Sequence, residues 1–147
     1  MITHKHSFSA RCIAVILILS MLIPINVCAT GFESRASLYL SAYNAYVYLP
    51  GTGEVRVYFD VSGTNYMDEI GALSISLYES TDGANWTWKK TFTHDMTAGM
   101  LSYIDDYHSG HVSYNGVAGR YYKAYVCIWA GKGGQGDSRY FWTSVKH

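Results

Sequence analysis

Hydrophobic and polar residues alternate along most of the chain after residue 36. Val55, Val57, Phe59 and Val61 are each separated by one other residue, and the stretch 70–79 alternates in the same way. A period of two sends successive side chains to opposite faces, so each segment predicts a half-buried β-strand. The same reasoning predicts seven strands in all, at residues 36–49, 55–61, 70–79, 86–93, 100–107, 119–130 and 138–145.

Turn-forming residues separate these segments. Proline and glycine at 50–53 end the first strand, and Asp82-Gly83 supplies the positive φ that a tight hairpin needs. A glycine-rich loop at 131–137 precedes the last strand. Outside the N-terminal segment no window has a convincing helical period. The pattern predicts an all-β fold, a two-sheet antiparallel β-sandwich of about seven strands, with a small β-barrel as the alternative.

The first 29 residues have the pattern of a secretory signal peptide. A basic start with Lys5 and Arg11 precedes a short apolar run, and small residues lead up to Ala29. We therefore expect a signal helix, cleavage between Ala29 and Thr30, and a secreted, extracellular single domain at 30–147. The apolar run is shorter than the roughly 20 residues of a membrane span, and no second such run follows.

Charge and cysteine content narrow the function further. Once Lys5 and Arg11 are removed, nine basic residues face eleven acidic ones, so the basic stripe of a nucleic-acid-binding protein is missing. All 14 tyrosines and all four tryptophans follow residue 38, a composition that favours β-structure. Cys127 is the one cysteine of the expected mature chain, which predicts a buried, inert thiol without a disulfide. No cofactor is indicated.

The segment 119–130 has the clearest two-sided pattern. One alternating set predicts the side that faces the core: Tyr122, Ala124, Val126, Ile128 and Ala130. The other set predicts an outward face: Tyr121, Lys123, Tyr125, Cys127 and Trp129. Tyr140 and Trp142 join the outward face in one of two strand registers, because a slip of one residue reverses every side chain.

These outward aromatic residues support two interpretations. Sugars present apolar C–H faces that stack on aromatic rings, and many carbohydrate-binding modules are β-sandwiches built in this way. The functional hypothesis is a glycan or cell-wall platform made of Tyr121, Tyr125, Trp129, Tyr140 and Trp142. The structural alternative is that the rings pack between sheets or cover one sheet. Tyr121 or Tyr122 can also form a tyrosine corner, a structural hydrogen bond at the start of a strand.

A second candidate site consists of polar residues around the fifth predicted strand. Zinc takes three or four nitrogen, oxygen or sulfur ligands, and converging loops could supply them from His94, Asp105, His108 and His111. Calcium could instead use Asp105 and Asp106 with backbone carbonyls. The spacing fits no named metal motif, and Gly110 is typical of a turn, so the alternative is a solvated polar loop.

Five stretches carry a resemblance to known sequences: 67–73, 78–83, 86–88, 119–126 and 139–144. With them the chain resembles an uncharacterised family of short exported proteins from Gram-positive, chiefly clostridial, bacteria. The resemblance implies an exported β-domain and brings no assigned catalytic or binding residue. The shorter pattern Ser80-x-Asp82-Gly83-x-x-Trp86 is similar to the Asp-box of sialidases, which implies a hairpin turn and no glycosidase chemistry.

Catalytic motifs are missing from the sequence. It contains neither a Gly-x-Ser-x-Gly elbow nor a His-Glu-x-x-His motif. We therefore expect a secreted, non-enzymatic binding or interaction module whose partner is cell-wall or host glycan. The alternatives are a secreted bacteriocin- or toxin-like effector and a metal-dependent hydrolase at the histidine and aspartate group.

Overall fold

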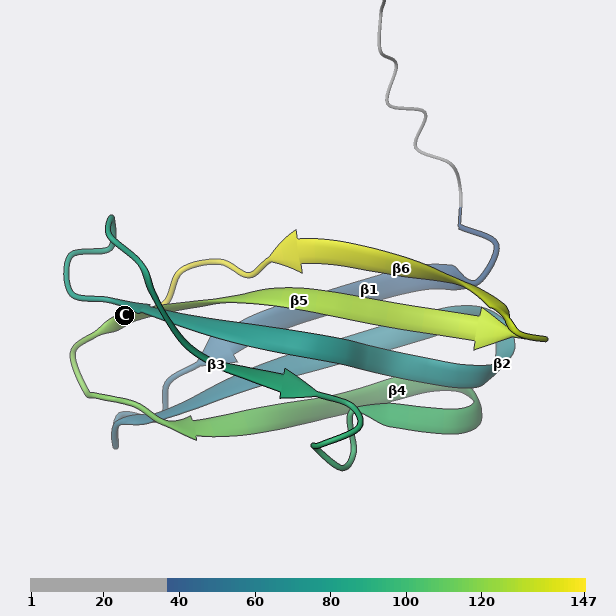
Figure 1. The fold of residues 1–147 in the computed structure, drawn as a ribbon, viewed down its shortest axis with the longest axis horizontal. Coiled ribbons are helices and arrows are strands. Elements are labelled where there is room, and N and C mark those ends of the chain that lie inside the picture. The colour runs from purple at the N-terminus through teal and green to yellow at the C-terminus, as the bar shows by residue number, and fades with distance from the viewer. Residues whose placement is uncertain (1–36) are drawn as a thin grey trace, which may run out of the picture. The chain divides into compact units, whose positions relative to one another are not determined.

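The computed structural model describes residues 37–147, and these form one antiparallel sheet that curls into a half-barrel (Figure 1). The six strands are β1 (Leu40–Tyr48), β2 (Glu54–Ser80), β3 (Thr87–Thr93), β4 (Leu101–Asn115), β5 (Tyr121–Lys132) and β6 (Gln135–Trp142). The predicted all-β class is confirmed, although the strands are not divided between two separate sheets. The expected signal helix and the cleavage site between Ala29 and Thr30 lie outside the described residues.

One long strand replaces two of the seven predicted strands. β2 runs for 27 residues. Its first part pairs with β1 and β4, and the pairing with β4 continues to Gly71. Its last part pairs with β5 from Glu69 onward and with β3 from Ser74 onward. The pairing with β4 shifts register between Ser62 and Met67. A Cβ on Gly63 would come within 2.9 Å of the Met67 side chain, which is buried in the bend. The chain therefore bends here without turning back.

The fifth predicted strand continues well past residue 107. β4 extends to Asn115 because Val112 pairs with Val57 of β2 and is buried beside it. Gly110 lies within the strand opposite Phe59, where an added Cβ would meet the phenyl ring at 2.8 Å. The turn expected at Gly110 is therefore wrong, because this glycine makes room for a core side chain.

The last hairpin is tighter than the sequence suggested. Only Gly133 and Gly134 form the turn, with φ values of 62° and 75°, and the strands continue on both sides of them. The predicted loop at 131–137 is therefore largely strand. β6 also ends at Trp142, earlier than expected, and the chain after it makes a single bridge between Lys146 and Tyr122.

The core lies on one face of the sheet, where aliphatic side chains from β1, β2, β4 and β5 meet. The predicted inward set of β5, from Tyr122 to Ala130, is buried as expected. It packs with alternating residues of β2 such as Val57, Phe59 and Leu77. Burying a side chain of this size stabilises the fold by about 1.5–3 kcal/mol each. Residues 37–147 hold no helical segment of membrane-spanning length and hydrophobicity.

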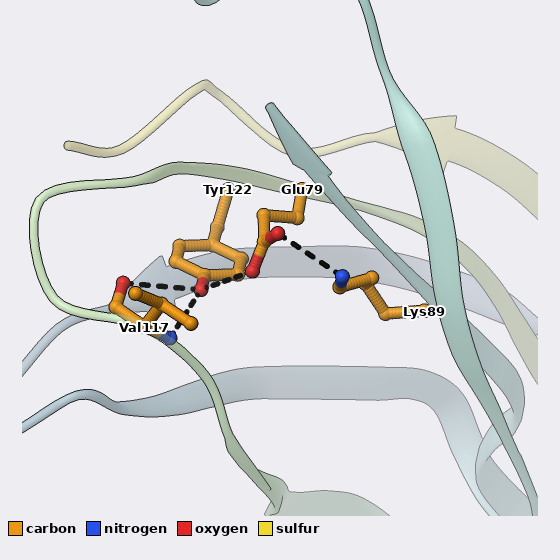
Figure 2. A network of polar contacts seen from close by, with 4 residues as sticks. All are labelled: Glu79, Lys89, Val117 and Tyr122. Atoms are coloured by element: carbon orange, nitrogen blue, oxygen red, sulfur yellow. Dashed lines mark hydrogen bonds and ion pairs between the residues drawn. The ribbon is translucent and has the colours of Figure 1, made fainter. Parts of the chain in front are cut away.

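A tyrosine corner fixes the start of β5, as the sequence suggested for Tyr121 or Tyr122. The buried hydroxyl of Tyr122 accepts a hydrogen bond from the backbone N–H of Val117 at 2.7 Å and donates one to Glu79 at 2.7 Å (Figure 2). Lys89 then pairs with the other oxygen of Glu79 at 3.0 Å. Burial, reinforced by the neighbouring carboxylate, raises the pKa of Tyr122 to about 12, so the phenol stays protonated.

The turn predicted at 80–83 is confirmed and is held by Asp82. Its Oδ1 accepts hydrogen bonds from the backbone N–H groups of Ala84 and Asn85 at 2.9 and 2.8 Å. The backbone and side-chain hydrogen bonds from Asn85, with those from Ala84 and Ser80, hold the pKa of Asp82 well below its usual range. The Asp-box-like pattern thus acts as a turn, between β2 and β3.

Candidate functional site

Four neighbouring strands build the outward face that the sequence singled out. Strand register aligns Tyr78 of β2 with Trp88 of β3 on one side and Lys123 of β5 on the other. One step further along β5, Tyr125 is opposite Trp142 of β6. Directly paired residues share a face of the sheet. The predicted outward side of β5 and the last hairpin therefore face away from the core together.

The rings on this face form a group that we call the outer aromatic cluster, made of Tyr78, Trp86, Trp88, Tyr125, Tyr140 and Trp142. Tyr125 contacts Trp142 with ring centroids 4.9 Å apart and stacks with Tyr140 at 6.0 Å. The ring of Tyr78 also contacts Trp142, with ring centroids 5.1 Å apart. Several rings remain open to solvent, with 61% of Tyr140, 56% of Trp88 and 48% of Trp142 exposed.

Polar side-chain groups lie between and beside the rings of the outer aromatic cluster. The ammonium group of Lys123 lies 4.2 Å from the ring centre of Trp86 and 4.5 Å from that of Trp142, so two cation–π contacts hold it between the tryptophans. The indole N–H of Trp88 donates to the hydroxyl of Thr91 at 3.1 Å. Thr91 also bonds the hydroxyl of Ser76 at 2.8 Å. Rings and hydroxyls thus alternate across the sheet.

Trp129 shares the outward face but lies apart from the cluster. Gly131 and Gly136 pair directly across the hairpin, and the indole of Trp129 covers both. A Cβ on Gly131 would meet the ring at 2.6 Å, so only glycine allows this placement. The indole N–H is the one buried side-chain polar group of residues 37–147 without a hydrogen-bond partner. The predicted platform is therefore divided, because Trp129 lies apart from Tyr125, Tyr140 and Trp142.

An open groove adjoins Trp129. Tyr103 of β4 and Glu69 of β2 line it, together with Lys132 and Gln135 from the two sides of the β5–β6 turn. Asp68 accepts a hydrogen bond from the N–H of Gly133 at 2.7 Å and fixes that turn beside the groove. The side-chain carboxylate of Glu69 makes no hydrogen bond or ion pair to any other residue of 37–147. The groove thus combines a flat indole with an unpaired carboxylate.

The remaining member of the predicted platform, Tyr121, lies at the beginning of β5. Its ring stacks on His147 with centroids 4.1 Å apart. It also lies against the turn at Gly83, where an added Cβ would contact the ring at 3.6 Å. Tyr121 therefore packs the end of the chain against the sheet, away from Tyr125 and Trp142.

The residues of the predicted metal-binding group do not come together. His108 and His111 lie on opposite faces of β4. The ring of His108 packs against Phe59 with centroids 5.6 Å apart, and its Nε2 lies 2.8 Å from the carbonyl oxygen of Gly99. His111 packs against Tyr58 at 5.0 Å. Asp105 bonds the hydroxyl of Ser102, and His94 follows β3. Among residues 37–147, no three histidine, cysteine, aspartate or glutamate side chains gather closely enough to hold a metal ion.

Sequence reasoning missed part of this surface. Tyr78, Trp86 and Trp88 join the cluster because β2, which forms a hairpin with β3, also pairs with β5. No local pattern reveals the β2–β5 pairing. The available signal was the alternation of Trp86-Thr87-Trp88, which places both indoles on one side of a strand. A second aromatic row, Tyr46–Tyr58–His111 across β1, β2 and β4, was missed for the same reason.

Comparison with known proteins adds no assignment. A scan against models of protein families finds no match to this chain, and a search of curated proteins finds no similar sequence. The residues and their geometry therefore carry the functional argument.

Proposed function

We propose that this chain is an exported, non-enzymatic binding protein of a Gram-positive bacterium and that it holds glycan or cell-wall polysaccharide on the outer aromatic cluster. The observation that carries the proposal is the exposure of Trp88, Tyr140 and Trp142 on one continuous face of four hydrogen-bonded strands. Rings that only completed a core would be covered, and large exposed apolar patches mark interaction sites.

The chemistry of the cluster suits sugars. A pyranose ring has an apolar face that stacks on an aromatic ring and a rim of hydroxyl groups that need polar partners. The cluster offers both, because the paired hydroxyls of Ser76 and Thr91 lie beside Trp88. The sheet also holds the rings in place before a ligand arrives, which lowers the entropy lost on binding.

A pull-down tests this function. The purified protein is incubated with insoluble peptidoglycan and with insoluble chitin, and Trp142→Ala and Tyr140→Ala are compared with Tyr66→Ala. Tyr66 is a matched control because it is 58% exposed on β2 and lies outside the cluster. We expect retention of the wild type and of Tyr66→Ala, and loss of retention in the two cluster variants.

Other outcomes redirect the assignment. Absence of retention on every polysaccharide would overturn the glycan proposal. Concentration-dependent self-association that Trp142→Ala abolishes would instead make the cluster an interface between two copies. Export is tested separately, by determining the N-terminus of protein recovered from the medium of a Gram-positive host, where we expect Thr30.

A further inference from the structure

Two aromatic surfaces lie in line on the outward face of the β5–β6 hairpin. Tyr125 and Trp129 are both outward residues of β5, four positions apart, which corresponds to about 13 Å along a strand. The position between them is Cys127, which is buried and lies opposite Tyr140. Tyr140 is exposed above it, so aromatic surface continues from Trp142 through Tyr140 toward Trp129. The two places thus belong to one strip.

The far end of this strip has the features of a binding groove. The indole of Trp129 lies flat over Gly131 and Gly136, and Tyr103 stands beside it with 64% of its surface exposed. Glu69, opposite both Gly131 and Tyr103 in the sheet, leaves its carboxylate free for ligand hydroxyls.

Backbone strain accompanies the groove. Ile104, which follows Tyr103, has a φ of 56°, in the left-handed region that a β-branched residue rarely adopts. Residues in such conformations cost about 1–3 kcal/mol and gather at binding sites, where the surrounding structure holds them. The strained residue Ile104 therefore directly follows the exposed aromatic residue that lines the groove, Tyr103.

We propose that the strip is an extended site for a linear, uncharged glycan strand, with one subsite at the outer aromatic cluster and a second at the Trp129 groove. The inference rests on the proposed function and adds the shape and charge of the ligand. A spacing of about 13 Å is too long for a single sugar ring to cover both ends. The groove is lined by two carboxylates, Asp68 and Glu69, and by one ammonium group, Lys132, so its net charge is negative and opposes an anionic chain. At the other end of the strip the charge of Lys123 is already held between two indoles.

Oligosaccharide length is the test. Binding of β-1,4-linked N-acetylglucosamine oligomers of two and six sugars is measured by calorimetry for the wild type, Trp129→Ala, Tyr103→Ala and the control Tyr66→Ala. Occupying two linked subsites raises affinity, so we expect the six-sugar oligomer to bind the wild type about tenfold or more tightly than the two-sugar one. Trp129→Ala and Tyr103→Ala should each lose about tenfold for the long oligomer alone.

Each alternative result has a definite meaning. Equal affinity for both oligomers, or unchanged binding in both groove variants, would overturn the second subsite while the proposed function stands. Retention on peptidoglycan without affinity for the six-sugar oligomer would overturn the uncharged strand as ligand. Failure to bind any polysaccharide or oligomer would overturn the function and this inference together. Tyr103→Ala tests the groove independently if Trp129→Ala fails to fold, because Tyr103 is largely exposed and its removal should leave the fold intact.

Discussion

The hydroxyl of Tyr122 donates a hydrogen bond to the carboxylate of Glu79, 43 residues earlier in the chain, at 2.7 Å. The two residues are direct partners in the β2–β5 pairing, and the same hydroxyl accepts the N–H of Val117. One buried phenol thus connects the start of β5 to the end of β2 and to the loop that precedes β5 (Figure 2). The contact holds the start of β5, one of the two strands that carry the aromatic strip.

Removal of this hydroxyl should therefore destabilise the whole domain. Tyr122→Phe leaves the N–H of Val117 and one oxygen of Glu79 without their partner, and we expect a loss of about 1–3 kcal/mol in the free energy of unfolding. Urea denaturation measures it. Tyr121→Phe is the control, because the adjacent ring stacks on His147 and its hydroxyl makes no hydrogen bond in the described residues. Equal free energies of unfolding for Tyr122→Phe and Tyr121→Phe would contradict a structural role for the hydrogen bonds of the Tyr122 hydroxyl.

Glu79 should make stability depend on acid pH. Burial opposes ionisation, but hydrogen bonds from Tyr122 and Lys89 outweigh it and hold the pKa of Glu79 below its ordinary value of 4.5. A folded-state pKa below the unfolded one contributes stability above pH 4.5 that is lost as the pH falls through the folded value. We expect the urea midpoint of Glu79→Gln to fall less steeply below that pH than that of the wild type. Glu69→Gln, on the same strand, is the matched control for the substitution itself, because the exposed side chain of Glu69 makes no hydrogen bond or ion pair in the described residues.

Gly131 should tolerate no side chain while Trp129 is present. In Gly131→Ala the new methyl group would meet the indole at 2.6 Å, and we expect a destabilisation of about 1–3 kcal/mol. Trp129→Ala removes the clashing ring, so the double variant should lose less than the sum of the two single changes. Thermal unfolding of the four proteins completes the cycle. Additive losses would show that the ring does not lie on the glycine.

Lys123 should contribute to the stability of the outer aromatic cluster. Lys123→Ala removes the ammonium from between Trp86 and Trp142, with an expected cost of about 1 kcal/mol and a change in tryptophan fluorescence. Lys123→Arg keeps the charge and should preserve most of the stability. An unchanged emission spectrum in Lys123→Ala would contradict the arrangement.

Cys127 should react only when the protein unfolds. Burial raises the pKa of its thiol, and the thiolate is the reactive form. We expect a disulfide reagent to label Cys127 slowly in the folded protein and rapidly in denaturant, when a chain that begins at Thr30 is used and Cys127 is therefore the one thiol present. Fast labelling under native conditions would mean that the strip between Tyr125 and Trp129 opens.

Local patterns were sufficient for the faces of β5 but not for the extent of the strands. Tyr122 and Val126 belong to one alternating set of β5, and the structure buries both. Tyr125 and Trp129 belong to the other set and face outward. The sequence predicts two strands, 55–61 and 70–79, where the structure has one, because the partners that keep β2 continuous through Gly63 lie far away in the chain.

The candidate site was predictable to a similar degree. Alternation places Tyr125 on the outward face but leaves open the register that decides whether Tyr140 and Trp142 join it. The observed register brings the three together. The separation of Trp129 was not predictable, because it depends on two glycines that become neighbours only when the hairpin closes. His108 and His111 were grouped by proximity in sequence, but a strand sends residues three positions apart to opposite faces.

The continuity of β2 also determines when the protein can fold. The second half of β2 leaves one edge without hydrogen-bond partners until β5, which begins only at Tyr121, is available to pair with it. Pairings between such distant segments form slowly and leave strand edges open in the meantime. A chain that emerges from its N-terminus can therefore form the β1–β2 and β2–β3 hairpins early, but its sheet stays incomplete until nearly all of the chain has been released.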